Sequence, residues 1–368
     1  MSFKNKNWDQ NKYFDVGELN WKKFSLSERD TEYSPSSVID GNYQPFINKY
    51  ASESKIARTV VQSKIHQYGN KKNQVIEITT FEKSTNELRP LLVFIHGGYW
   101  QELSIKESFF PSTEAVKNDI GYAAIEYSLA PNVSVSEIVD ECKEAIDWIF
   151  TNAANLGYDH KKIILSGSSA GAHLVAMCLL KINKFSPLGA VLVSGIYNIE
   201  PLIGTSIDEA LSLTNSQAYE NSPINFSLEN FPPTIVTWGE NETEQFKKQS
   251  KILVNKLIDE GVPVRSLEIK KKNHFDIMVG YSDHTLGKEA CFAAVALGSS
   301  IIEKHFTLDN KFSNFRDHAL SLNPKNFKKM VEQIREAEKI LGNKLKMVFP
   351  SEKKNLISIF PFSTLSDP

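Results

Sequence analysis

The pentapeptide Gly167-Ser168-Ser169-Ala170-Gly171 stands between the apolar run 163–165 and the helix-prone run 172–180. A strand, a tight turn and a helix in that order place a serine hydroxyl above the edge of a sheet. Glycine is needed at both outer positions because the turn leaves no space for side chains there. Ser169 is therefore a candidate nucleophile. A glycine- and serine-rich loop without function is the alternative, and the rest of the chain has to decide between the two.

Around this turn, short β-branched runs alternate with helical segments. The strand candidates are residues 75–79, 91–95, 122–127, 163–166, 190–194, 234–238 and 264–269, and the clearest helix candidates are 136–153, 170–182 and 243–260. This alternation predicts an α/β fold with a mostly parallel sheet and helices on both faces. Ligands of such sheets bind at the carboxyl ends of the strands. The proline-rich stretch 195–233 interrupts the alternation and is predicted to form a cap over that edge.

Composition limits the classes of partner. The chain has 368 residues and a formal net charge of -2 at pH 7, which gives no electrostatic footprint for nucleic acid or an anionic membrane. We therefore expect a small-molecule substrate.

No stretch has the length and apolarity of a membrane span or signal peptide, which predicts a cytoplasmic protein. The sequence does not predict the oligomeric state. Cys142, Cys178 and Cys291 are far apart and are expected to be reduced, packed thiols.

A serine nucleophile also requires donors for the oxyanion that develops during attack. The run from His96 to Trp100, HGGYW, follows the strand candidate 91–95. Backbone N–H groups of Gly97 and Gly98, with the N–H of Ala170, are predicted to form the oxyanion hole. Tyr99 and Trp100 are expected either to line an aromatic substrate pocket or to pack under the cap.

The base and the orienting acid are sought after later strands. His274 follows the strand candidate 264–269, so a loop there can bring its imidazole over Ser169. Glu242 follows the strand candidate 234–238 and is the preferred acid, with Glu240 and Glu244 as alternatives. The chain order nucleophile, acid, histidine is the order of α/β-hydrolases. Two other histidines are expected to be structural: His96 as an anchor of its loop, and His173 as a residue packed against the sheet.

Several longer motifs are more selective than the pentapeptide. They are YSPSS from Tyr33, FIHGGYWQELS from Phe94, EYSLAPNVSVSEIV from Glu126, SGSSAGAHLVAM from Ser166, SGIYNIEPL from Ser194, WGENETEQFKKQS from Trp238 and NHFDI from Asn273. Together they resemble the kynurenine formamidase (arylformamidase) branch of the α/β-hydrolases over residues 30–277. The resemblance implies a hydrolase without a cofactor that converts N-formylkynurenine to kynurenine and formate through a formyl-enzyme. Relatives with this pattern also cleave esters and carbamates, so an ester is the alternative substrate.

After residue 277 the chain resembles a second family. GYSDHTLG from Gly280, AAVALGSSIIEKHFTLD from Ala293 and PSEKKNLISI from Pro350 are similar to the sialic acid synthase family over residues 279–359. The resemblance implies the last part of a TIM barrel, with His284 and His305 holding a divalent metal such as manganese. The six preceding strands are missing, and a barrel fragment cannot close. We therefore expect an inactive, vestigial metal site rather than a working synthase.

These resemblances predict four segments: a polar arm at 1–30, a hydrolase domain at 31–277, a barrel fragment at 278–359 and an unmatched tail at 360–368. Residues 323–341 are predicted to form an amphipathic helix. The change of family close to His274 removes the helix that would support this base, and 286–297 is a candidate replacement. Two alternatives to the hydrolase follow: a remnant of a metal-dependent synthase that condenses phosphoenolpyruvate with a sugar, and a non-catalytic fusion product.

Overall fold

The computed structural model describes residues 13–17, 20–81, 88–275, 280–283, 301–310, 318 and 321–341. The backbone forms two compact units, Met1–Asp276 and Ile277–Pro368. His284, Cys291 and the candidate helix 286–297 lie outside the described residues.

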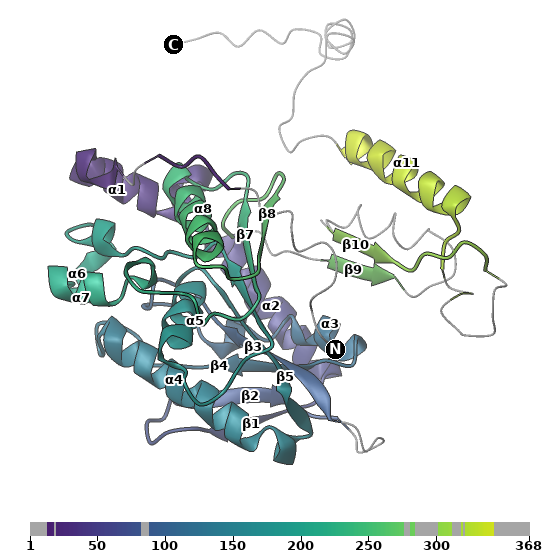
Figure 1. Cartoon of the computed structure of the whole chain (residues 1–368), viewed down its shortest axis with the longest axis horizontal. Coiled ribbons are helices and arrows are strands. Elements are labelled where there is room, and N and C mark those ends of the chain that lie inside the picture. Colours follow the sequence, from purple (N-terminus) through teal and green to yellow (C-terminus); the bar gives the residue numbers. More distant parts are fainter. Residues whose placement is uncertain are drawn as a thin grey trace, which may run out of the picture. The chain divides into compact units, whose positions relative to one another are not determined.

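The first unit contains an eight-stranded sheet in the order β1-β2-β4-β3-β5-β6-β7-β8 (Figure 1). The strands are β1 Ser63–Gln67, β2 Val75–Thr79, β3 Arg89–Ile95, β4 Gly121–Ile125, β5 Tyr158–Ser168, β6 Gly189–Val193, β7 Thr234–Gly239 and β8 Val264–Ile269. The pairs β1–β2 and β2–β4 are antiparallel, and the other pairs are parallel. The predicted α/β fold with a mostly parallel sheet is confirmed.

Both faces of the sheet are covered. The helices of this unit are α1 Leu26–Tyr33, α2 Gln44–Val60, α3 Ser112–Lys117, α4 Val135–Asn152, α5 Ala170–Lys181, α6 Asp208–Leu211, α7 Asn215–Glu220 and α8 Glu244–Asp259. In β3, Leu91, Val93 and Ile95 belong to the core that includes α4, α5 and α8. The alternate residues Leu92 and Phe94 pack on a second core with side chains of α2 and α3. Apolar residues on both faces of one strand are what a buried parallel sheet requires.

The segment 195–233, predicted as a cap, joins β6 to β7. It contains α6, α7 and the short 3-10 helices Glu200–Leu202 and Pro223–Asn225. Its apolar side chains, including those of Leu202 and Phe231, are buried in the main core. The segment is therefore packed on the sheet domain at the end where β6 stops.

The first helix, α1, connects parts of the chain that are distant in sequence. Ser25 and Glu28 form a capping box that starts it. The Arg29 guanidinium donates to the carbonyls of Pro201 and Ile203 at 3.0 and 2.8 Å. At its other end, the backbone carbonyl of Glu32 accepts a hydrogen bond from the Thr243 hydroxyl at 2.6 Å. Thus α1 ties the segment after β6 to the start of α8.

The second unit is small. Strands β9 Gly280–Asp283 and β10 Ile301–Lys304 pair in parallel, and α11 Pro324–Leu341 confirms the predicted amphipathic helix. Met330 and Ile334 of α11 are buried with Leu322, whereas Val331 is 38% exposed. In the described part of the chain, no helix is long and apolar enough to cross a membrane.

Candidate active site

The pentapeptide forms the predicted sharp turn between β5 and α5. Ser169 has φ 56° and ψ −122° and begins α5, a backbone conformation that a non-glycine residue adopts only under strain. A Cβ on Gly167 would lie 2.3 Å from the Gly171 carbonyl oxygen, and one on Gly171 would lie 2.0 Å from the Ile95 carbonyl oxygen. Both outer glycines are therefore required by close backbone contacts. The Ser169 N–H donates to the Val193 carbonyl at 2.8 Å, which ties the turn to β6.

Glu242 and His274 form a buried pair after the next strands of the sheet. His274 Nδ1 lies 3.0 Å from Glu242 Oε2, and the two side chains are 5% and 1% exposed. Glu242 Oε1 accepts from the Ser194 hydroxyl at 2.6 Å and from the Gly239 N–H at 2.5 Å. When Nδ1 carries the proton toward Glu242, Nε2 is the basic nitrogen of the ring.

The two alternative carboxylates have other partners. Glu240 accepts from the Lys271 N–H at 2.8 Å and from Lys270 Nζ at 2.9 Å, and these hydrogen bonds lower the pKa of Glu240. Glu244 is exposed and pairs with Lys247. Of the three candidates, Glu242 is the carboxylate in contact with His274.

The loop that carries His274 is held from two sides. Phe246 of α8 places its ring 4.7 Å from the imidazole. From α2 and the residue before it, the rings of Phe46 and Tyr43 pack 5.8 and 5.6 Å from that of Phe275, and the Tyr50 hydroxyl donates to the Phe275 carbonyl. This support could not be predicted from the sequence, because α2 is not among the expected helices.

The HGGYW segment passes directly over the turn. A Cβ on Gly97 would lie 3.0 Å from the Ser169 Cβ. The Tyr127 hydroxyl donates to the carbonyls of His96 at 2.9 Å and Gly97 at 3.2 Å. In a trans peptide, the next N–H points opposite to the carbonyl, so the N–H groups of Gly97 and Gly98 point away from Tyr127.

His96 anchors this segment, as its position suggested. Its ring stacks on that of Tyr127 with centroids 4.2 Å apart, and its Nδ1 lies 2.9 Å from the Gly97 carbonyl oxygen. The side chain is 1% exposed.

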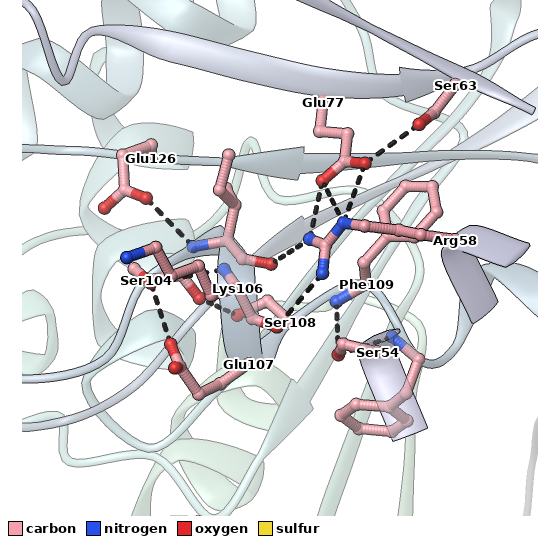
Figure 2. A network of polar contacts seen from close by, with 12 residues as sticks. Ser54, Arg58, Ser63, Glu77, Ser104, Lys106, Glu107, Ser108, Phe109 and Glu126 are labelled. Carbon is pink, nitrogen blue, oxygen red and sulfur yellow. Dashed lines mark hydrogen bonds and ion pairs between the residues drawn. The ribbon is translucent and has the colours of Figure 1, made fainter. Parts of the chain in front are cut away.

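The chain after HGGYW is fixed by the polar network in Figure 2. The Arg58 guanidinium donates to Glu77 at 2.7 Å and to the Ile105 carbonyl at 2.7 Å. The Glu126 carboxylate accepts from the Ile105 N–H at 2.9 Å. Because charged groups bond the backbone of this loop from α2 and from the segment after β4, the glycines ahead of it are attached to a rigid support.

The two aromatic residues of HGGYW have different surroundings. Trp100 is completely buried, with its ring edge-on to that of His173 at 4.9 Å, which fits the packing alternative. Tyr99 is partly exposed and its ring lies 6.4 Å from that of Phe246, which in turn contacts His274. Tyr99 is thus the residue of the two that can face a bound molecule.

His173 lies one turn along α5 from Ser169 and is completely buried. Its Nε2 lies 2.6 Å from the Asn221 carbonyl oxygen. Burial lowers the pKa of His173 to about 4. The residue is therefore neutral near pH 7 and packs as expected.

The chain is similar to known hydrolases over most of its length. A family model described as BD-FAE matches residues 76–191. The kynurenine formamidase of Danio rerio is 30% identical over 275 residues, which cover 70% of this chain and 92% of that protein. The chain belongs to the kynurenine formamidase family. Its relatives are hydrolases, and this chain is a hydrolase of the α/β-hydrolase fold. The esterase LipW of Mycobacterium marinum, 16% identical with a TM-score of 0.53, covers 63% of this chain and 80% of its own and shares the fold.

The C-terminal region is similar to a different family. The NeuB family model matches residues 264–346. The N,N'-diacetyllegionaminic acid synthase of Campylobacter jejuni is 40% identical over 114 residues, which are 30% of this chain and 34% of the synthase. The chain therefore carries about a third of such a synthase, and a partial synthase-like region follows the hydrolase.

The predicted metal pair is only partly described. His305 directly follows β10, and His284 lies outside the described residues. Within the described part of the chain, no group of three or more histidine, cysteine, aspartate or glutamate side chains is arranged to hold a metal ion. His318, which comes after both in the sequence, has its Nδ1 2.9 Å from the Thr307 hydroxyl.

Ser194 is the contact that sequence reasoning missed. It directly follows β6 and donates to Glu242. The rule that functional residues gather at the carboxyl ends of parallel strands could have indicated it, because Ser194 closes the strand candidate 190–194.

Proposed function

We propose that this hydrolase cleaves a formamide or ester with Ser169 as nucleophile, His274 as base and Glu242 as orienting acid. The observation that carries the proposal is the buried Glu242–His274 hydrogen bond of 3.0 Å at the same sheet edge as the strained Ser169 turn. A histidine held by a carboxylate is the base that activates a serine in unrelated hydrolases.

In the proposed reaction, His274 Nε2 takes the hydroxyl proton as Ser169 Oγ attacks the carbonyl carbon. Glu242 stabilises the imidazolium that forms. The oxyanion accepts hydrogen bonds from the N–H groups of Gly97, Gly98 and Ala170; the last of these is a free donor because Ala170 is the first residue of α5.

His274 then protonates the leaving nitrogen or oxygen, the bond to the carbonyl carbon breaks, and Ser169 carries the acyl group. Water, deprotonated by His274, attacks this acyl-enzyme; the bond to Ser169 Oγ then breaks, His274 returns the proton to that oxygen, and the acid is released. Among the described residues no hydrogen bond joins the Ser169 hydroxyl to His274. Such a bond often closes only when substrate is bound.

N-formylkynurenine is the proposed substrate, with kynurenine and formate as products. The family relationship supports this choice, since the relative from Danio rerio carries the name kynurenine formamidase. The partly exposed ring of Tyr99, which packs on Phe246 next to His274, offers an apolar surface for the aromatic leaving group. We further propose that the reaction needs no cofactor or metal, that the protein is cytoplasmic, and that the synthase-like region is inactive.

The test compares the full chain with Ser169→Ala, using Ser168→Ala as the matched control one residue away. Each protein is assayed on N-formylkynurenine and on p-nitrophenyl acetate, with and without a chelator. Ser169→Ala is expected to lose about 10⁴-fold or more of kcat, as nucleophile removal does in serine hydrolases, while Ser168→Ala keeps most of it.

Activity that survives Ser169→Ala, or that the chelator abolishes, would refute the serine mechanism. Ester turnover without formamide turnover would refute the substrate and leave the mechanism standing. A wild-type chain without any turnover would favour the non-catalytic alternative.

A further inference from the structure

Ser194 has a backbone conformation that serine rarely adopts. Its φ is 49°, in the left-handed region, and the residue is only 4% exposed. Glycine adopts this conformation with less strain. A strained, buried non-glycine residue at a sheet edge points to a role for its side chain.

The backbone of this turn is fixed to both neighbouring strands. The carbonyl of Val193 accepts from the Ser169 N–H at 2.8 Å, and the N–H of Ser194 donates to the Thr237 carbonyl on β7 at 2.7 Å. These two bonds use opposite sides of one peptide group. The planar peptide group between Val193 and Ser194 therefore fixes Ser194 relative to the proposed nucleophile.

The Ser194 hydroxyl donates a hydrogen bond to Glu242, the proposed acid. Glu242 is buried, and one of its oxygens contacts His274. The other accepts from the Ser194 hydroxyl at 2.6 Å and from the Gly239 N–H at 2.5 Å. Hydrogen bonds to a buried carboxylate favour its charged form and fix its rotamer.

We propose that Ser194 is a positioning residue of the hydrolase, whose hydroxyl orients Glu242 toward His274. The inference rests on the proposed function and names a residue outside the triad. Removing the hydroxyl takes away one of the two hydrogen bonds that hold Glu242 Oε1. The carboxylate is then less well oriented toward the imidazole, which lowers kcat.

Among the described residues, the neighbours of this pair include one titratable side chain and two apolar rings. Tyr197, after β6, is completely buried, and burial, with the nearby charge of Glu242, raises its pKa. Phe246 of α8 and Phe275 of the histidine loop are apolar neighbours of the imidazole. Lys270, which directly follows β8, pairs with Glu240 after β7 and with Glu268 of β8.

The test uses Ser194→Ala and Ser194→Gly in the full chain, with Ser166→Ala as the control. Ser166 is also a buried serine, 6% exposed, and donates to the Val93 carbonyl at 3.2 Å away from Glu242. Both variants at 194 are expected to lose about 10- to 100-fold of kcat on p-nitrophenyl acetate, the effect of losing one hydrogen bond to a charged group. KM is expected to change less than about twofold. Ser194→Gly separates this loss from misfolding, because it relieves the backbone strain.

A second readout does not depend on turnover. The proton in the hydrogen bond between His274 Nδ1 and Glu242 is followed by ¹H NMR, with His274→Asn to assign its resonance. This resonance is expected to move or broaden in both variants at 194, because Glu242 is less well oriented, and to stay unchanged in Ser166→Ala. An unchanged resonance in Ser194→Ala overturns the inference, as does an unchanged kcat. If the wild type shows no Ser169-dependent turnover, the proposed function fails, and the NMR resonance still decides the role of Ser194.

Discussion

Acid should destabilise the hydrolase unit through His173. In the folded chain, burial lowers the pKa of this imidazole from its ordinary value of 6.5 to about 4. In the unfolded chain it titrates near the ordinary value. Between these two pKa values, His173 binds a proton in the unfolded state but not in the folded state. The free energy of unfolding therefore falls as the pH falls from 6.5 toward 4.

The size of the effect follows from the gap between the two pKa values. At about 1.4 kcal/mol per pH unit, the full gap corresponds to about 3 kcal/mol, of which about 2 kcal/mol is lost between pH 7 and pH 5. That is a large part of the stability of an ordinary domain.

Urea unfolding followed by tryptophan fluorescence measures this loss. All five tryptophans of the chain lie within Met1–Asp276, so the signal reports the hydrolase unit alone. The variant His173→Gln keeps a donor for the Asn221 carbonyl but cannot titrate. We expect its free energy of unfolding to fall by about 2 kcal/mol less than that of the wild type between pH 7 and pH 5.

The exposed His160 supplies the control, since His160→Gln should keep the wild-type pH dependence. Equal losses in the wild type and in His173→Gln over this range would show that His173 is not the group responsible.

Two further substitutions test the packing around the site. Gly171→Ala places a Cβ 2.0 Å from the Ile95 carbonyl oxygen and should cost about 3 kcal/mol by overpacking; an unchanged urea midpoint would contradict the close contact between α5 and β3. Arg58→Met leaves the buried Glu77, 4% exposed, without its ion pair and should cost about 3–5 kcal/mol. The double change Arg58→Met with Glu77→Met should recover most of this loss in the same urea experiment, and no recovery would place the cost elsewhere.

Much of the fold could be predicted from the sequence because most strands are buried on both faces. Strands β2 and β8 have the predicted bounds, and the other predicted strands differ by a few residues. The edge strand β1 was missed: its Ile65 is 63% exposed, so it lacks the apolar pattern that identifies a buried strand. Helix α2 was missed for the same reason, since only Ser54 and Ala57 of its residues are buried.

The order of the site residues along the chain could also be predicted, but their contacts could not. Glu240 and Glu242 follow the same strand. The sequence cannot show that the side chain of Lys270 and the backbone N–H of Lys271 donate hydrogen bonds to Glu240. The support of the His274 loop by Tyr50 joins residues 225 positions apart. Such contacts depend on how strands and helices are arranged in space, and local sequence patterns do not predict them.

The contacts of α1 also bear on the order in which the molecule is made. This helix is synthesised early, yet its partners Pro201 and Thr243 lie 172 and 211 positions after the residues they bind. Closing loops of this length costs entropy that only the finished contacts repay, so they form late. On the ribosome, α1 has to remain undocked until α8 has emerged. We therefore expect the first helix of the chain to be among the last elements to dock.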